Sequence, residues 1–461
     1  MIKYLKIKNY LPRRFGSTSL WIILCAGLGI LLLGSCKKKM ANEEDSASTL
    51  KFFKGSYNDK VAKIEKTSDG GFIYCGFTQS GSKVDAFMMR VDANGKQLWY
   101  HTFGGPNFDE FRSVIQTSDG GFLGVGTSNS FGQALADSTI NHFDYVVKVN
   151  ANGIEEWGHS YCMYAASLNG VIELPNHKYA ITGGIVPYSE TYIYFCIVNP
   201  DGSLYKSNFY PYYGYNYAND LYFLPPNKID KYYNFFGISL ALTNDDSIMV
   251  VGVMNKSGLN TEAHTLCTFY LKVGLNGNLR PGYFYPYYQY VRKGVYQYSW
   301  PGHTRRYPPI TVFKKTDGYM FLTYIEPSDN SGRMQIFKTD LAGDVLWEKE
   351  YSGLNTAFYY NVEVNPDGNM LLVGMSTTET TSSGYPELFA NSKVMLMLVD
   401  PEGNEIWEQY TGSDVNVNIA KCAQAAPGGG WNVAGYSTSN ETGYDKMFVI
   451  KVDQSGKLIT K

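Results

Sequence analysis

Long apolar segments are almost absent from this sequence of 461 residues. Leu20–Leu33 forms one run of about fourteen apolar and small residues, and a membrane-spanning helix needs about twenty. No other run is long enough to cross a bilayer. The sequence therefore gives no sign of a protein that crosses the membrane repeatedly through helices.

Catalytic and metal-binding motifs are also scarce. Only six histidines occur, and none has the HExxH spacing or another spacing typical of metal ligands. Neither a G-x-S-x-G elbow nor a phosphate-binding loop is present. We therefore predict no metal and no catalytic residue. His101 and His159 share a position in the repeat described below, and we interpret them as surface positions on a strand.

Neither sign of charge dominates, and cysteines are few. With 40 basic and 42 acidic residues the formal net charge is −2, so no general attraction to nucleic acid is expected. Seven cysteines occur without a close pair. We interpret most of them as small buried side chains, with a disulfide as the alternative. Those not assigned to the amino-terminal segment are Cys75, Cys162, Cys196, Cys267 and Cys422.

What the sequence does contain favours a folded protein. Hydrophobic residues make up 44% and charged residues 18%, which is a composition that can bury a core. Tyrosine is unusually frequent, with 39 copies.

The amino terminus has the features of a targeting segment. Five basic residues precede the run Leu20–Leu33, and the run ends in "LLGSC" at Cys36. This pattern resembles a bacterial lipobox, which implies cleavage before Cys36 and acylation of its thiol, for example with palmitate. We expect residues 1–35 to be a lipoprotein signal peptide and 36–49 a flexible tether; an ordinary signal peptide or an uncleaved anchor is the alternative. Lys37 fits sorting to the outer membrane, and "NEED" resembles surface-export signals.

A short motif repeats along the remaining chain. "TSDGGF" occurs at Thr67–Phe72 and again at Thr117–Phe122, between segments that read as strands. Asp-Gly-Gly accepts positive φ, so the motif predicts a hairpin turn. Degenerate copies bring the number of such turns to seven; they lie at Asn176–Tyr179, Asp245–Ile248, Asp317–Met320, Asp367–Met370 and Gly428–Trp431.

A second turn recurs in the same order and number. It reads "DANG" at Asp92 and appears seven times in all, up to "DQSG" at Asp453. Four tryptophans lie four residues after its glycine: Trp99, Trp157, Trp347 and Trp407. A further glycine follows the first turn at a nearly fixed offset, at Gly76, Gly126, Gly183, Gly252, Gly374 and Gly435. Two independent markers therefore agree on seven units.

Four antiparallel strands per unit, repeated seven times at roughly 59 residues each, predict an all-β fold, a seven-bladed β-propeller over residues 50–461. The units resemble bacterial secreted propeller repeats with the pattern TSDGGF…KxDxxGxxxW, a family that implies a fold and little chemistry. Leu50–Lys54 aligns with an outer strand, so we expect it to complete the last blade and remove a free sheet edge.

Strand order also predicts where a site would lie. With strands A to D running outward in each blade, A–B and C–D turns share one face, and the longer B–C and D–A connections share the other. Two long D–A connections both contain Tyr-Pro-Tyr-Tyr, a sequence suited to stacking on sugars or packing a partner. The alternative is that these tyrosines only pack loops onto the ring. The candidate ligand-binding residues are Tyr212, Tyr213, Tyr215, Tyr217, Tyr287, Tyr288, Tyr290, Trp300, Arg305 and Arg306.

We therefore expect a lipid-anchored binding protein of the bacterial outer membrane, with an envelope protein or a glycan as its partner. No cofactor is predicted, because propellers that hold pyrroloquinoline quinone carry an adjacent cysteine pair that this sequence lacks. Two alternatives stay open: a propeller hydrolase or lyase acting on polysaccharide, with acid and base from several blades, and a structural subunit of an envelope complex.

Overall fold

The computed structural model describes residues 59–131, 142–162, 164–186, 192–210, 233–243, 245–256, 264–286, 295–296, 311–315, 317–325, 333–341, 345–351, 356–377, 391–412, 416–426, 429–438 and 444–459. The chain divides into two compact units, Met1–Asp45 and Ser46–Lys461, and every described residue belongs to the second. Within the described part, no helix is long and apolar enough to cross a membrane. Cys36 and the predicted signal peptide and tether lie outside the described residues.

The strands group into seven antiparallel sheets, which we call blades 1 to 7. Blade 1 holds β1 (Asp59–Lys66), β2 (Phe72–Ser80), β3 (Lys83–Val91) and β4 (Gln97–Phe103), and blade 2 holds β5 (Asp109–Gln116), β6 (Phe122–Ser128), β7 (Phe143–Val149) and β8 (Glu155–His159). Blade 3 holds β9 (Ala165–Glu173), β10 (Tyr179–Val186), β11 (Tyr192–Val198) and β12 (Leu204–Tyr210). Blade 4 holds β13 (Tyr233–Leu242), β14 (Ser247–Lys256), β15 (His264–Gly274) and β16 (Leu279–Pro286), with β17 (Val295–Tyr296) beside β15.

The remaining three blades complete the ring. Blade 5 holds β18 (Thr311–Lys315), β19 (Gly318–Ile325), β20 (Arg333–Thr339) and β21 (Val345–Tyr351), and blade 6 holds β22 (Thr356–Val364), β23 (Met370–Thr377), β24 (Lys393–Val399) and β25 (Glu405–Thr411). Blade 7 holds β26 (Val417–Ala425), β27 (Trp431–Thr438) and β28 (Asp445–Val452).

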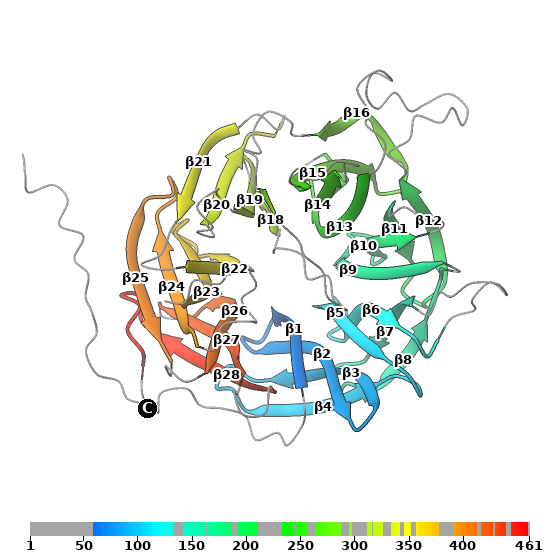
Figure 1. The fold of residues 1–461 in the computed structure, drawn as a ribbon, viewed down its shortest axis with the longest axis horizontal. Helices are drawn as coiled ribbons and strands as arrows, with labels where there is room; N and C mark the ends of the chain where they lie inside the picture. Colours follow the sequence, from blue (N-terminus) through cyan, green and yellow to red (C-terminus); the bar gives the residue numbers. More distant parts are fainter. Residues whose placement is uncertain are drawn as a thin grey trace, which may run out of the picture. The chain divides into compact units, whose positions relative to one another are not determined.

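The seven sheets follow one another around a ring, with the first strand of each sheet innermost and the last at the rim (Figure 1). The protein is thus a seven-bladed β-propeller, as predicted. The predicted amino-terminal strand of blade 7, Leu50–Lys54, lies outside the described residues.

The repeated "TSDGGF" segment is the A–B turn. In blade 1, the Gly70 amide donates to the Thr67 carbonyl at 3.0 Å, and Gly70 has φ of +87°. Asp69 accepts from the Thr67 hydroxyl and from the Gly71 amide. The predicted positive φ is confirmed. The two hydrogen bonds to the Asp69 carboxylate explain why an aspartate recurs at this position of the turn.

The tryptophan that recurs in the repeat joins one blade to the next. Trp99 on β4 donates from Nε1 to the Ala151 carbonyl in the C–D turn of blade 2, at 3.0 Å. Its ring also meets Phe122, the last residue of "TSDGGF" in blade 2, edge-on at 5.6 Å. Trp157 and Trp407 make the same kind of bond to the next blade. Both repeated turns are therefore partners of the preceding blade's tryptophan.

The glycine that follows the A–B turn faces a bulge in the inner strand. A Cβ on Gly126 would lie 2.0 Å from the Glu110 carbonyl oxygen, and the pairing of β5 with β6 skips one residue at this point. No side chain fits that approach. Blade 5 has Tyr324 in place of this glycine, and the described pairing of β18 with β19 ends at Leu322, before that position.

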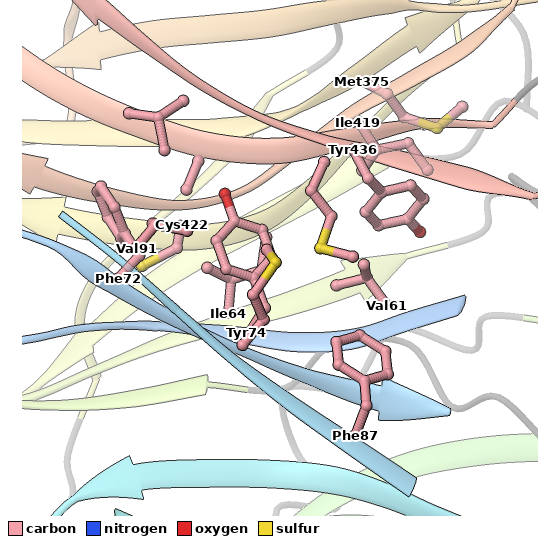
Figure 2. Close-up of a cluster of buried hydrophobic side chains, with 14 of the residues drawn as sticks. Val61, Ile64, Phe72, Tyr74, Phe87, Val91, Met375, Ile419, Cys422 and Tyr436 are labelled. Atoms are coloured by element: carbon pink, nitrogen blue, oxygen red, sulfur yellow. The ribbon is translucent and has the colours of Figure 1, made fainter. Parts of the chain in front are cut away.

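Blades 7 and 1 meet through an apolar core. Val61, Ile64 and Tyr74 of blade 1 pack with Ile419, Cys422 and Tyr436 of blade 7 (Figure 2). The Tyr74 hydroxyl donates to the Phe448 carbonyl of β28 at 2.8 Å. This closure involves residues that are far apart in the sequence.

The cysteine interpretation is confirmed for four residues. Cys75, Cys162, Cys196 and Cys422 are buried free thiols, each within an apolar cluster.

Candidate functional site

The two faces of the ring differ in the length of their connections. The described strand bounds leave two to five residues in A–B connections and four or five in C–D connections. B–C connections have two to fifteen residues, and D–A connections have four to twenty-four. Variation is therefore confined to the B–C and D–A face, where elaborated loops on a rigid scaffold commonly carry function.

On the other face, the aspartates of the short C–D turns accept hydrogen bonds from amides of the same turn. Asp92 Oδ1 accepts from the amides of Asn94 and Lys96, both at 2.8 Å. Asp400 and Asp453 repeat this arrangement. These carboxylates complete turns. In the described part of the chain, no group of three acidic, histidine or cysteine side chains is arranged to hold a metal.

The two longest D–A connections lie on either side of blade 4. Twenty-two residues separate β12 from β13, and twenty-four separate β16 from β18, with β17 among them. β17 pairs with His264 and Thr265 at the start of β15, on the same face. All ten candidate ligand-binding residues belong to these two connections and lie outside the described residues. The two connections that contain Tyr-Pro-Tyr-Tyr are therefore both attached to blade 4, one before β13 and one after β16.

Exposed aromatic side chains mark the strand that leads into the first connection. Phe209 on β12 is 50% exposed and meets Tyr192 edge-on at 6.4 Å. Tyr205, near the start of the same strand, is 49% exposed, and Lys178 Nζ lies 3.3 Å from its ring centre. The sequence analysis did not single out Phe209, although it directly precedes the first Tyr-Pro-Tyr-Tyr.

A second cluster lies at the inner margin of the ring. In the described part of the chain, six inner strands carry a bulge. The residues skipped by the pairing are Ala62, Arg112, Asn169, Ile238, Tyr360 and Lys421. Of these bulge residues, Arg112, Asn169 and Lys421 each contact a neighbouring inner strand. The repeat pattern does not predict these bulge residues, because a bulge depends on how two strands pair.

Arg112 and Lys421 are the two cations among these bulge residues. The Arg112 guanidinium binds Glu110 on the same strand and the Ser167 hydroxyl on β9 of blade 3. Glu110 is buried and Arg112 is partly exposed. On the other side of the ring, Lys421 Nζ lies 3.5 Å from the centre of the Tyr360 ring. The inner margin therefore contains two cations, Arg112 and Lys421, the phenol of Tyr360 and the buried carboxylate of Glu110.

Two carboxylates meet at the junction of blades 7 and 1. Asp445 accepts from the Val61 amide at 3.0 Å and from Lys60 Nζ at 3.3 Å. Asp59 accepts from the Tyr100 hydroxyl at 2.8 Å. Burial, helped by the neighbouring charge of Asp445, raises the pKa of Asp59 to about 6, against hydrogen bonds from Thr78 and Tyr100 that lower it. Burial likewise raises the pKa of Asp445.

This carboxylate pair is poorly placed for a substrate. Asp59 is 2% exposed and Asp445 is 6% exposed. A paired carboxylate with a shifted pKa often marks an active site, but structural pairs shift in the same way. With both groups buried between blades, we assign them to the junction.

No protein-family model matches this chain, and neither does any curated protein sequence. Among solved structures, the polysaccharide lyase Uly1 is similar over 91% of this chain and 95% of its own, with a TM-score of 0.51 and 8% identity. An ulvan lyase of polysaccharide lyase family PL25 is similar over 90% and 97%, with a TM-score of 0.50 and 9% identity. At such identities the likeness shows the fold alone.

Proposed function

We propose that this protein is a lipid-anchored binding protein of the bacterial outer membrane that holds a glycan on the B–C and D–A face, beside blade 4. The observation that carries the proposal is where the two tyrosine-rich connections are attached. One joins β12 to β13 and so enters blade 4, and the other joins β16 to β18 and so leaves blade 4. Tyrosine presents an apolar ring face and a polar rim, which suit stacking on sugars.

The lipid anchor follows from the lipobox at Cys36. Acylation there would hold the propeller at the membrane surface, and a single chain anchors only marginally, so more than one acyl chain is expected. Mass spectrometry of the mature protein tests this, because an unmodified Cys36 or a retained signal peptide would remove the anchor from the proposal.

The binding role is tested with the full chain, purified in detergent, on a glycan array. We expect the double variant Tyr212→Ala with Tyr213→Ala to lose at least about tenfold in affinity, as aromatic stacking contributes on the order of 1 kcal/mol or more per ring. The pair Tyr287→Ala with Tyr288→Ala should do the same.

The matched control is Tyr205→Ala. This tyrosine is 49% exposed on β12 but lies near the C–D turn, at the opposite end of the strand from the tyrosine-rich connection. Its substitution should leave glycan binding unchanged. Unaltered binding in both double variants, or a protein partner captured in place of any glycan, would contradict the proposal.

Polysaccharide cleavage is the second candidate function. The two lyases with this fold support it, as does the cluster of Arg112, Glu110 and Ser167, since an arginine can neutralise the carboxylate of an acidic sugar. Incubation with uronate-containing polysaccharides and detection of shortened or unsaturated products tests it. Activity that Arg112→Ala abolishes would favour the enzyme, and its absence with retained binding would favour the binding protein.

A further inference from the structure

Phe131 is an exposed aromatic residue on the B–C and D–A face, in the connection that follows β6. Its side chain is 40% exposed. Most of the other large apolar side chains that are exposed in the described part of the chain lie at the C–D turns, on the opposite face. Phe209 is the exception, and it belongs to the strand that leads into the first tyrosine-rich connection. Phe131 is therefore on the face that the proposed function uses, but on blade 2.

A column of aromatic side chains holds the Phe131 ring. The ring stacks on Tyr145 of β7, with ring centres 5.4 Å apart and planes at 28°. Tyr145 stacks in turn on Phe111 of β5, at 5.4 Å and 9°. Both supporting residues are buried. The column therefore fixes the Phe131 ring while part of its surface stays open to solvent.

A buried carboxylate fixes the backbone next to this ring. Asp109 is fully buried, and its Oδ2 accepts from the Gly105 amide at 2.8 Å and from the Ser130 hydroxyl at 2.7 Å. Its other oxygen accepts from the Ser128 hydroxyl. That hydroxyl oxygen accepts in turn from the Phe131 amide at 3.0 Å. Because these bonds hold the ring in place before a ligand arrives, little conformational entropy is lost on binding.

Three polar side chains, two amides and an imidazole, are linked to the residues just before Phe131. Asn129 Oδ1 lies 2.6 Å from His142 Nδ1. Asn107 Nδ2 donates to the Asn129 carbonyl at 3.1 Å, and the Asn107 amide donates to Ser130 Oγ at 2.9 Å. Asn107 and His142 are exposed, and Asn129 is partly exposed. Side chains of these types exchange hydrogen bonds with hydroxyl groups.

The repeat does not require an aromatic residue at this position. Gly76 in β2 and Gly126 in β6 occupy the same place in the repeat, fifty residues apart. Phe131 therefore corresponds to Gly81, in the B–C turn of blade 1. Gly81 has φ of +64°, and a Cβ there would meet no other atom within 4 Å. The exposed ring is thus a property of blade 2 and not of the propeller fold.

We propose that Phe131 is a stacking platform for one neutral sugar ring, with Asn107, Asn129 and His142 exchanging hydrogen bonds with its hydroxyl groups. The C–H face of a pyranose is apolar and covers a flat aromatic ring, while its hydroxyl groups point outward to polar neighbours. The inference rests on the proposed glycan binding, to which it adds a contact on blade 2 and a class of sugar.

The surroundings of Phe131 favour a neutral sugar over other ligands. A protein interface has a core of several apolar and aromatic side chains, whereas the residues linked to Phe131 at the surface are polar. An acidic sugar is best held by an arginine or a lysine, and neither takes part in the contacts described above. The one carboxylate among them, Asp109, is buried.

Isothermal titration of the full chain tests this platform, in a detergent without a sugar headgroup. The neutral probes are cellohexaose, xylohexaose, mannohexaose and maltohexaose, and the acidic probe is the hexasaccharide of polygalacturonate. We expect at least one neutral probe to bind, and Phe131→Ala to weaken its binding by at least about tenfold. Phe131→Tyr keeps the aromatic ring and should bind like the unaltered chain.

Two further variants separate lost stacking from lost folding. Phe131→Leu still packs an apolar side chain on Tyr145, so it should keep the melting temperature and lose the affinity. Ile154→Ala removes an exposed apolar side chain from the C–D turn of the same blade and should leave affinity unchanged. Full affinity in Phe131→Ala and Phe131→Leu, or binding of the acidic probe alone, would overturn the inference.

The tyrosine variants distinguish this inference from the proposed function. Loss of affinity in Phe131→Ala but in neither tyrosine pair would support the platform and contradict the site beside blade 4. Loss in the tyrosine pairs alone would do the reverse. If none of the hexasaccharides binds, the inference is wrong, whereas another glycan bound on the array would still support the proposed function.

Discussion

At the residue scale, the aspartate of the A–B turn forms an ion pair with a cation on strand C, which the repeat pattern did not predict. Asp69 binds Arg90, and Asp119 binds Lys148, a residue at the end of strand C whose side chain is almost fully buried. Burial raises the pKa of each aspartate, but bonds from the turn and from the cation outweigh it and hold both pKa values at about 2. Blade 3 has Asn176 and Ile197 at these two positions, so it lacks both partners.

His177 offers a test of turn chemistry. It has φ of +62° at the position where blades 1 and 2 have glycine, and a non-glycine residue there costs about 1–2 kcal/mol. His177→Gly relieves this cost and loses two exposed contacts, with Glu173 at 3.2 Å and with the Ser118 hydroxyl at 2.9 Å, which are each worth a few tenths of a kcal/mol. We expect a gain of about 0.5–1 kcal/mol in the free energy of unfolding, measured in urea. Asp246→Gly, at φ of +54°, should change stability in the same direction. A loss in both variants would contradict the assignment.

Asp59 gives the protein a pH dependence in a defined window. Its pKa is about 6 in the folded chain and near 3.9 when unfolded, so folding favours the protonated form. The stability it contributes is present below pH 4 and is lost as the pH rises to about 6, on the order of 2–3 kcal/mol at most. We expect Asp59→Asn, which can still accept from Tyr100, to flatten the fall in thermal stability between pH 4 and pH 6.5.

The turn aspartates titrate in a different window and serve as the control. Because the pKa values of Asp69 and Asp119 are lowered, their contribution is present above pH 4 and is lost below it. Asp69→Asn should therefore lower stability above pH 4 by an amount that stays constant between pH 4 and pH 6.5, and its difference from the unaltered chain should shrink only below pH 4. An unchanged slope between pH 4 and pH 6.5 in Asp59→Asn would refute the role assigned to Asp59.

At the element scale, each blade depends on its neighbour through the outer-strand tryptophan. A glycine in the next blade's C–D turn makes room for it, since a Cβ on Gly153 would lie 2.8 Å from the Trp99 ring. The tryptophan of one unit therefore contacts the C–D turn glycine of the next unit. Each unit supplies both residues, with the glycine four positions before the tryptophan. This explains why both markers recur in the same order.

Trp99→Phe tests this contact. The change removes the bond from Nε1 to the Ala151 carbonyl and part of the packing on Phe122. We expect a loss of about 1–2 kcal/mol in the free energy of unfolding. Leu98→Ala is the neighbouring control, because Leu98 is 50% exposed and should change stability by no more than about 0.5 kcal/mol. Equal effects would show that the indole bond does not matter.

At the scale of the whole molecule, the ring holds together at a junction between its first and last blades. Tyr74 of β2 donates to the Phe448 carbonyl, and the Lys66 ammonium pairs with Glu363 of blade 6 at 2.6 Å. These residues are separated by about three hundred positions or more in the chain. Stability of the ring thus depends on contacts of very long sequence range, a class of contact that slows folding.

Tyr74→Phe measures the strength of this junction. The buried Phe448 carbonyl loses its donor, so the free energy of unfolding should fall by about 1–2 kcal/mol. Tyr194→Phe is a closely matched control, because Tyr194 is also buried and its hydroxyl has only the weakly bonding thiol of Cys196 as a partner among the described residues. It should leave stability unchanged or raise it slightly. A similar loss in both variants would assign the effect to packing rather than to the bond.

The sequence by itself determined the number of blades, the two kinds of turn and the burial of the four described cysteines, Cys75, Cys162, Cys196 and Cys422. Each of these depends on local chemistry: a glycine at positive φ, an aspartate that bonds its own turn, or a small side chain in an apolar strand. Tertiary structure alone decided which residues meet. Asp59 and Asp445 come together because the ring closes, and Arg112 reaches Ser167 because the inner strands bulge; neither the closure nor the bulge can be predicted from a single repeat.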